Sequence, residues 1–99
     1  MEHIENQELW FKFELGQLVI TQGAQELLER LGKSPFEYLL RHVQGDWGDM
    51  EDADKAENEF ALTRELRIFS SYQLTEEEKL WIISEADRSA TTTLLPSEY

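Results

Sequence analysis

The spacing of apolar residues changes from a helical period to a strand period within the chain, and this change most constrains the fold. Between residues 24 and 61, apolar side chains recur every three or four positions, which is the spacing of one helix face. From residue 66 onward they alternate with polar residues or form short β-branched runs, which is typical of strands. Helices followed by a run of strands indicate an α+β protein.

Three helices are predicted in the first part. Thr21 can cap the first helix, and Gly32 is a typical terminator in the left-handed conformation. Ser34 followed by Pro35 gives the clearest helix start in the chain. The third helix is predicted over residues 49–62, with acids in its first turns, where they suit the helix dipole. The predicted apolar faces are Ala24, Leu27, Leu28 and Leu31 in the first helix, Phe36, Leu39, Leu40 and Val43 in the second, and Ala53, Ala56, Phe60 and Ala61 in the third.

Four strands are predicted. Residues 9–21 alternate in strand fashion around Gly16, which is interpreted as a bulge in one long strand or as part of a tight turn between two short strands. Residues 66–74, 80–85 and 90–96 have short polar connections and predict an antiparallel meander. The predicted fold class is α+β, with about three helices packed on one face of a four-stranded, mainly antiparallel sheet (order β-α-α-α-β-β-β). Residues 1–99 are predicted to form a single domain, with residues 1–8 as a flexible N-terminus.

The net charge of the chain limits the classes of molecule that it can bind. It carries 21 acidic against 9 basic residues, a net charge of −12, and both halves are acidic. Such a field repels nucleic acid and anionic membranes and favours basic partners. The absence of cysteine excludes disulfides and thiolate metal sites, and no apolar run approaches the roughly 20 residues of a membrane span. We expect a cytoplasmic protein without a cofactor, with a basic protein as its partner.

A dense set of carboxylates follows the second predicted helix. Carboxylates could bind a hard cation, but the spacing of a calcium loop is absent, so no metal site is predicted. The acids are interpreted as a solvated helix start that can serve as a contact surface. Trp47, between two glycines, is predicted to insert into the core or a groove wall, with ligand stacking as the alternative. The predicted binding residues are Asp46, Trp47, Asp49, Glu51, Asp52, Asp54, Glu57 and Glu59.

A second set of polar residues allows an enzymatic interpretation. His42 lies near the end of the second predicted helix, either as a general base or as a histidine favoured by the negative end of the helix dipole. Small ribonucleases use such a base on the 2′-hydroxyl and an arginine to stabilise the phosphorane. The candidate catalytic residues in this reading are His42, Arg67, Ser70, Tyr72, Arg88 and Thr91. The sequence contains no metalloprotease, phosphate-loop or serine-hydrolase motif.

Five segments carry a resemblance to known sequences: "GQLVITQGAQELL", "RHVQGDWGD", "AENEFAL", "RIFSSY" and "KLWIISEADRSATTTLLPSEY". They resemble a family of short bacterial proteins on plasmids and integrative elements, often labelled "plasmid-related protein" and sometimes restriction-system subunits. The resemblance extends over residues 11–99. The chain departs from the family pattern at Ser84, where a threonine is expected, and at Glu65, where a glycine turn is usual. The family implies a mobile-element context and no residue roles. The restriction label is not justified for a chain with no methyltransferase motif.

These observations leave two main functional hypotheses. The first is a non-enzymatic interaction or inhibitor protein that binds a basic partner, including one that itself binds nucleic acid. The second is a small ribonuclease of barnase or RelE layout that uses His42 and Arg88. Because the acidic field works against RNA binding, the first is preferred. A structural subunit that forms a homodimer is a third possibility.

Overall fold

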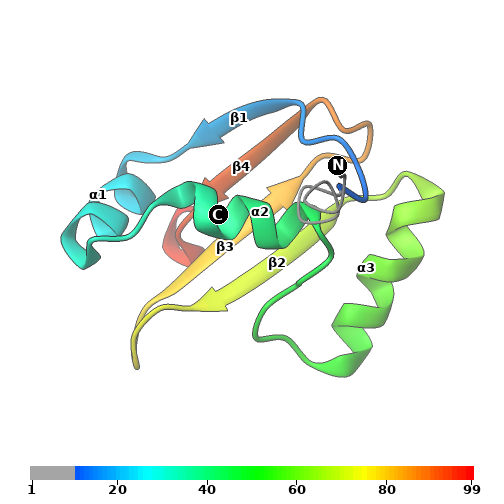
Figure 1. Ribbon diagram of the computed structural model, residues 1–99. Coiled ribbons are helices and arrows are strands. Elements are labelled where there is room, and N and C mark those ends of the chain that lie inside the picture. Colours follow the sequence, from blue (N-terminus) through cyan, green and yellow to red (C-terminus); the bar gives the residue numbers. More distant parts are fainter. Residues whose placement is uncertain (1–10) are drawn as a thin grey trace, which may run out of the picture.

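The computed structural model describes residues 11–99, so the predicted flexible N-terminus (1–8) lies outside the described residues. The described elements are β1 (Gln17–Ile20), α1 (Gln22–Leu31), α2 (Pro35–Val43), α3 (Asp52–Arg64), β2 (Ile68–Gln73), β3 (Lys79–Ser84), β4 (Ala90–Leu94) and a short 3₁₀ helix, η2 (Pro96–Glu98). Figure 1 shows three α-helices and one four-stranded sheet. The predicted α+β class and element order are confirmed.

The sheet has the strand order β1-β4-β3-β2. β2, β3 and β4 form the predicted antiparallel meander, in which Ser84 pairs with Ile68 on one side and with Thr91 on the other. β1 pairs with β4 in parallel, with Leu18 opposite Thr91. The sheet is therefore mixed, with β1 and β2 as its two edges.

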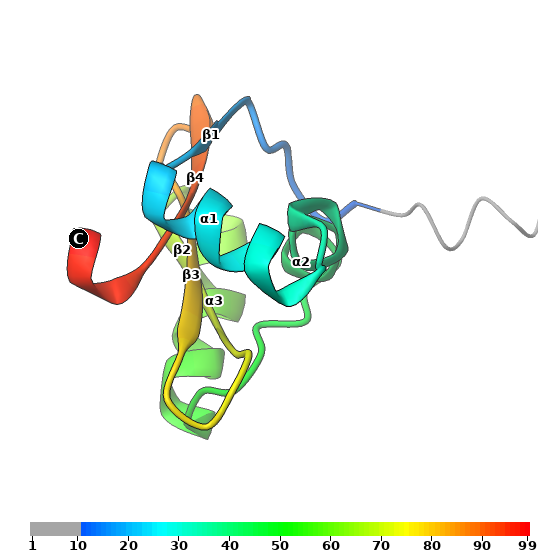
Figure 2. The same ribbon diagram turned by 90° about the vertical axis from the view of Figure 1, so that its left-hand side faces the viewer.

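The helices do not all occupy one face of the sheet. Viewed along the sheet, α1 and α2 lie on the same side (Figure 2), whereas α3 lies beside β2 at the sheet edge (Figure 1). The prediction of three helices on one face therefore needs correction for α3. Only Asn58 and Ala61 are buried in α3, so this helix has no broad apolar face that could cover a sheet.

The main core lies between α1, α2 and the inner face of the sheet. It joins Ala24, Leu28, Tyr38, Leu39, Tyr72, Leu80 and Ile82. α2 is rotated from its predicted orientation, because Tyr38 and His42 are buried beside Leu39 and Val43. Phe36 and Leu40, predicted to face the core, are instead 65% and 38% exposed. The reason is that the aromatic and imidazole rings find both packing and hydrogen-bond partners on the sheet.

Neither interpretation of Gly16 is correct, because β1 begins only at Gln17 and residues 11–16 form no strand. Gly16 has a positive φ of 66°, and a Cβ there would collide with the carbonyl groups of Arg88 and Ser89. The glycine therefore lets the entering chain pass close to the β3–β4 turn, where Gln17 N–H donates to the Ser89 carbonyl at 2.9 Å. Phe13 turns inward and contacts the rings of His42 and Trp47.

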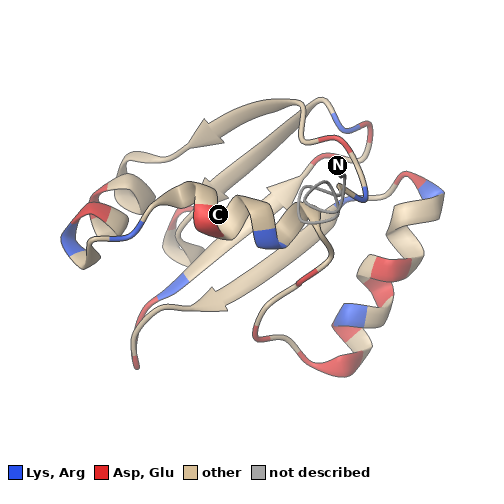
Figure 3. Cartoon of the chain, in the orientation of Figure 1, with Lys and Arg blue, Asp and Glu red and all other residues tan. Residues whose placement is uncertain are grey.

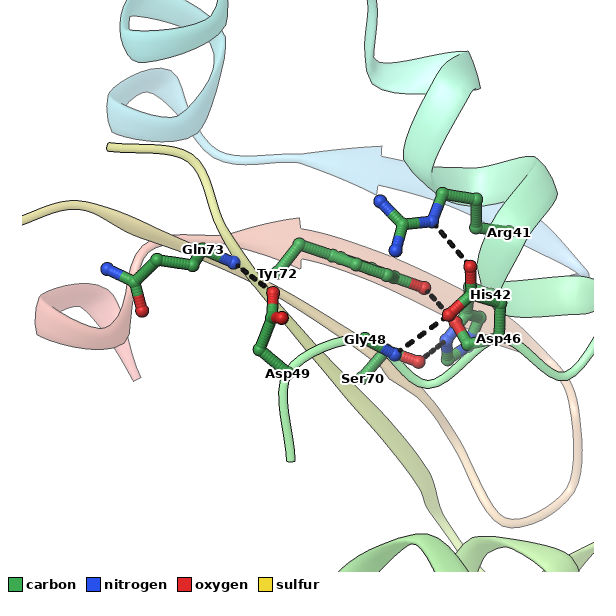
Figure 4. Close-up of polar contacts among 8 residues, drawn as sticks. All are labelled: Arg41, His42, Asp46, Gly48, Asp49, Ser70, Tyr72 and Gln73. Carbon is green, nitrogen blue, oxygen red and sulfur yellow. Dashed lines mark hydrogen bonds and ion pairs between the residues drawn. The ribbon is translucent and has the colours of Figure 1, made fainter. Parts of the chain in front are cut away.

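The β2 edge is closed by side chains and by a loop. The Asn58 amide donates to the Phe69 carbonyl at 2.6 Å and accepts from the Phe69 N–H at 3.1 Å. Two residues on, Ser71 N–H donates to the Trp47 carbonyl at 3.1 Å, and the Ser71 carbonyl accepts from Asp49 N–H at 2.6 Å. The Asp49 carboxylate then accepts from Gln73 N–H at 2.8 Å (Figure 4). The outward N–H groups of Phe69, Ser71 and Gln73 and the outward carbonyls of Phe69 and Ser71 are therefore already paired, which hinders the addition of another strand here.

Replacing Asn58 with alanine tests this closure. We expect the Asn58→Ala variant to lose about 2–3 kcal/mol of unfolding free energy, since two groups of Phe69 lose their partner. Urea denaturation measures the loss, and Thr63→Ala on the exposed side of α3 is the control. Equal losses in the two variants would contradict the role assigned to Asn58.

Glu65 explains why a glycine is expected at the end of the third helix. It is the C-cap of α3 and holds the left-handed conformation, with φ 55° and ψ 50°. A residue with a side chain costs roughly 1–2 kcal/mol in this conformation, and glycine removes most of that cost.

We expect the Glu65→Gly variant to be more stable by ~1 kcal/mol in urea denaturation. Gly32→Ala, at the equivalent position of α1 with φ 69°, should be less stable. A destabilised Glu65→Gly variant would refute this account.

Candidate functional site

His42 is the centre of a buried hydrogen-bond chain. It lies in the last turn of α2 with no exposed surface. Its Nδ1 is 2.6 Å from Ser70 Oγ of β2, as Figure 4 shows, and its Nε2 is 3.0 Å from Ser84 Oγ of β3. Ser84 Oγ is 2.6 Å from Thr91 Oγ1 of β4, which bonds the Leu15 carbonyl at 2.7 Å. One chain of contacts thus links α2 to three strands and to the segment before β1.

The carbonyl at the end of this chain fixes the direction of each bond. A carbonyl only accepts, so Thr91 donates to Leu15, and Ser84 must donate to Thr91. His42 Nε2–H then donates to Ser84, while Nδ1 accepts from Ser70. The geometry assigns the neutral tautomer with its proton on Nε2.

The surroundings of His42 keep its ring uncharged. Burial lowers the pKa of His42 to about 3, and the positive charge of Arg88 contributes to the same shift. A neutral ring gains nothing from the helix dipole, and a ring without exposed surface cannot reach a substrate. Both interpretations drawn from the sequence placed His42 at an accessible helix end, whereas its ring is buried between Ser70 and Ser84 on the inner face of the sheet.

The Arg88 side chain forms hydrogen bonds within the fold. Its guanidinium donates to the carbonyls of Ala61, Leu66, Glu85 and Ala86 at 2.8–3.0 Å. These bonds tie the C-terminal end of α3 to the β3–β4 turn. The Phe13 ring lies 5.5 Å from the guanidinium and 5.3 Å from the His42 ring, so Phe13 fills the space next to both. An arginine that already donates to four carbonyls has reduced capacity for a phosphate.

The other catalytic candidates divide between two places. Ser70 and Thr91 belong to the His42 chain, and Tyr72 lies beside it, with its hydroxyl donating to the Asp46 carbonyl at 2.7 Å. Burial raises the pKa of Tyr72. Arg67 is apart from them: it is exposed and donates to the Tyr99 hydroxyl at 3.2 Å. None of the six candidates is an accessible base of the kind that the ribonuclease hypothesis requires.

Ser84 was not among the candidates, although it connects His42 to Thr91. The signal for it was present in the alternation of β3, where Leu80, Ile82 and Ser84 share the inner face and are fully buried. A serine in phase with two buried aliphatic residues needs a polar partner. That partner comes from α2 and could be identified only once the helix was placed.

The "GDWGD" segment (residues 45–49) forms a loop that is hydrogen-bonded to the edge strand β2. The Arg41 Nε–H donates to the Asp46 carboxylate at 2.7 Å, and Gly48 N–H donates to it at 3.1 Å (Figure 4). Burial favours the protonated acid, but these bonds to Arg41 and Gly48 lower the pKa of Asp46. Gly48 has a φ of 87°, and a Cβ there would collide with the Ser71 carbonyl. Asp46 therefore serves this loop rather than a ligand.

Trp47 occupies a second small core, as predicted. It is 3% exposed and packs with Ala61 and Ile68. Its indole N–H donates to the Glu59 carboxylate at 2.9 Å. The buried ring is unavailable for ligand stacking, and Glu59 is partly committed to holding it.

Four of the eight predicted binding residues remain on the surface without such a structural duty. Glu51, Asp52, Asp54 and Glu57 are exposed at and after the start of α3, where Figure 3 shows a concentration of acids. Beside them is a groove of about 660 Å³ whose apolar lining includes Met50, Phe60, Leu66 and Phe69 and whose polar lining includes Asp54, Glu57 and Arg67. We call this hollow the α3 groove. Exposed carboxylates and exposed apolar side chains therefore meet in one place.

Comparisons with known proteins leave the family open. No family model matches the chain, and no curated protein or solved structure matches it either. The resemblance to plasmid-borne proteins stays a prediction. Within residues 11–99, no three histidine, cysteine or acidic side chains are grouped so that they could hold a metal ion. None of the helices described in that range has the length and apolar character of a membrane span.

The His42 chain predicts how stability depends on pH. The unfolded histidine titrates near 6.5, whereas the folded one titrates at about 3. Below pH 6.5 only the unfolded chain takes up this proton, so stability is complete above that pH and falls by about 1.4 kcal/mol per pH unit below it. Urea unfolding at pH 7, 6 and 5 should show a loss of about 2 kcal/mol over the range, before most carboxylates titrate.

Two variants isolate this effect. His42→Gln should be less stable at pH 7 but should lose the slope between pH 7 and pH 5. His3→Gln replaces the other histidine of the chain and should keep the slope. A slope that persists in His42→Gln would mean that another group carries it.

Proposed function

We propose that the chain is a non-enzymatic interaction protein that binds a basic protein segment in the α3 groove. The observation that carries this proposal is the meeting of exposed carboxylates with an apolar hollow along α3. The candidate catalytic residue His42 is fully buried, and Arg88 donates to carbonyl groups of the fold, which favours the surface as the source of function.

The apolar part of the groove supplies binding energy. Phe60 and Leu66 are 53% and 47% exposed although both are large hydrophobic residues. A partner that covers them removes apolar surface from water, which is the main favourable term in most protein association. The partner should therefore carry apolar side chains of its own on the face that enters the groove.

The charged part supplies orientation and selectivity. Asp54 and Glu57 line the groove, and Glu51 and Asp52 extend the acidic surface toward the start of α3. Within a chain of net charge −12, this surface attracts lysine and arginine and speeds encounter with a basic protein. An amphipathic helix with one basic and one apolar face fits both requirements.

The predicted mobile-element context is compatible with such a role. A protein of that kind acts as an accessory factor or inhibitor when it covers a basic surface, including one that otherwise binds nucleic acid. The ribonuclease alternative ranks second, because it requires α2 to lift from the sheet before His42 meets a substrate. Incubation of purified protein with RNA tests it, and we expect the RNA to remain intact.

Removing the α3 carboxylates should weaken binding. The probe is a helical peptide with lysine on one face and leucine on the other, titrated calorimetrically at low and at high salt. In the triple variant Asp52→Asn, Asp54→Asn, Glu57→Gln, we expect roughly tenfold weaker binding at low salt, because three favourable charge pairs are lost. Higher salt should weaken binding of the unmodified protein by screening the same charges.

A matched variant separates the α3 surface from the net charge of the whole chain. Glu37→Gln, Glu76→Gln, Glu77→Gln removes the same number of charges from exposed positions outside the groove. It should bind the peptide as the unmodified protein does. Equal weakening in the two triple variants, or no binding by the unmodified protein, would refute the α3 groove as the site.

A further inference from the structure

The second edge of the sheet, β1, is open. Gln17 and Thr21 N–H groups donate to the Ser89 and Thr93 carbonyls of the β4 side at 2.9 Å and 3.0 Å. In a parallel pair, bonds to the neighbour come from alternate residues, so Leu18 and Ile20 direct their backbone groups away from β4. No element described in residues 11–99 pairs with that side of β1. At the β2 edge, by contrast, the outward backbone groups of Phe69 and Ser71 are paired.

Apolar side chains surround this open edge. Leu18 of β1 is 46% exposed, and across a small hollow Phe36 and Leu40 of α2 are 65% and 38% exposed. The hollow between them has a volume of about 190 Å³, and Leu15 also lines it. The rotation of α2 that buries His42 leaves Phe36 and Leu40 largely uncovered by the rest of the described chain.

The strand at this edge also carries no charge of its own, and the Glu98 carboxylate is bonded to Thr21 and Gly23 beyond the end of β1. No charged residue occurs from Leu15 to Gln25, although 30% of the chain is charged. Edge strands are usually protected by lysine, proline, a bulge or a covering segment, and β1 has none of these within the part of the chain that the structure describes. An unprotected edge strand without charge can pair with a strand from another molecule.

We propose that this edge pairs with β1 of a second copy of the chain. Antiparallel pairing about a two-fold axis sets Leu18 of each copy opposite Ile20 of the other, and each such pair exchanges backbone hydrogen bonds in both directions. The two sheets become one continuous sheet, and the two Leu18–Phe36–Leu40 surfaces lie next to each other.

The charge of the chain favours a second copy, rather than a basic protein, as the partner of the β1 edge. A basic partner is drawn to the acids of α3, which lies beside β2 at the opposite edge of the sheet. Two copies that each carry −12 repel one another, so they can meet closely only through a neutral surface. β1 and the apolar hollow beside it supply such a surface, and it is the same on both copies, as a two-fold interface requires.

The two interfaces respond to salt in opposite directions. Screening removes the repulsion between two acidic copies, so dimerisation should strengthen as salt rises. Binding of a basic peptide in the α3 groove should weaken under the same change. This inference therefore stands independently of the proposed function, and either can fail without the other.

Sedimentation equilibrium of the full chain at increasing concentration and salt tests the dimer. We expect a monomer–dimer equilibrium that shifts toward dimer at high salt. Leu18→Pro removes an outward N–H, which an edge strand tolerates, and should weaken the dimer at least about tenfold. Phe60→Ser removes an exposed aromatic ring of α3 and should dimerise normally.

A second variant tests the dimer even if Leu18→Pro fails to fold. Leu40→Lys changes an exposed residue of α2 and leaves the strand intact, and it should also weaken the dimer. A monomer at high concentration and high salt would overturn the proposal. So would a dimer that both variants leave unchanged, or one that is lost in Phe60→Ser.

Discussion

The structure depends on one buried chain of hydrogen bonds, which runs from Ser70 through His42, Ser84 and Thr91 to the Leu15 carbonyl. Buried polar groups cost free energy unless each is paired, and here every proton has an acceptor. The chain sets the rotation of α2, since the ring must face two serines on neighbouring strands. That rotation buries Tyr38 and leaves other apolar residues of α2 at the surface. The need to pair the buried His42 ring thus determines which apolar side chains of α2 are exposed.

The two edges of the sheet then have different chemistry. At β2, Asn58 and the "GDWGD" loop satisfy the backbone, and the acids beyond them line a groove with an apolar floor. At β1, the backbone is open, and the flanking sequence carries no charge from Leu15 to Gln25. The acidic edge suits a basic partner, and the neutral edge suits a second acidic copy. Function in this account is proposed to come from surfaces, because His42, Ser70 and Thr91 are buried inside the fold.

Local features of the fold could be predicted, and long-range ones could not. Thr21, Ser34 and Gly32 mark helix ends through bonds made within a few residues, and the meander follows from alternation and short turns. The parallel pairing of β1 with β4 joins distant segments, and no local pattern encodes it. For the site, the burial of Trp47 followed from its glycine neighbours. The role of His42 did not, because its partners lie on strands whose position relative to α2 only the tertiary structure gives.

The central claim is that His42 is neutral, protonated on Nε2 and sealed inside the fold. Nitrogen-15 NMR of the imidazole ring in the folded protein tests it most directly. The account predicts an Nε2 bonded to hydrogen, an Nδ1 without one, and shifts that stay constant from pH 7 to pH 5. A ring that titrates in the folded protein near its usual pKa, or the opposite tautomer, would contradict the account.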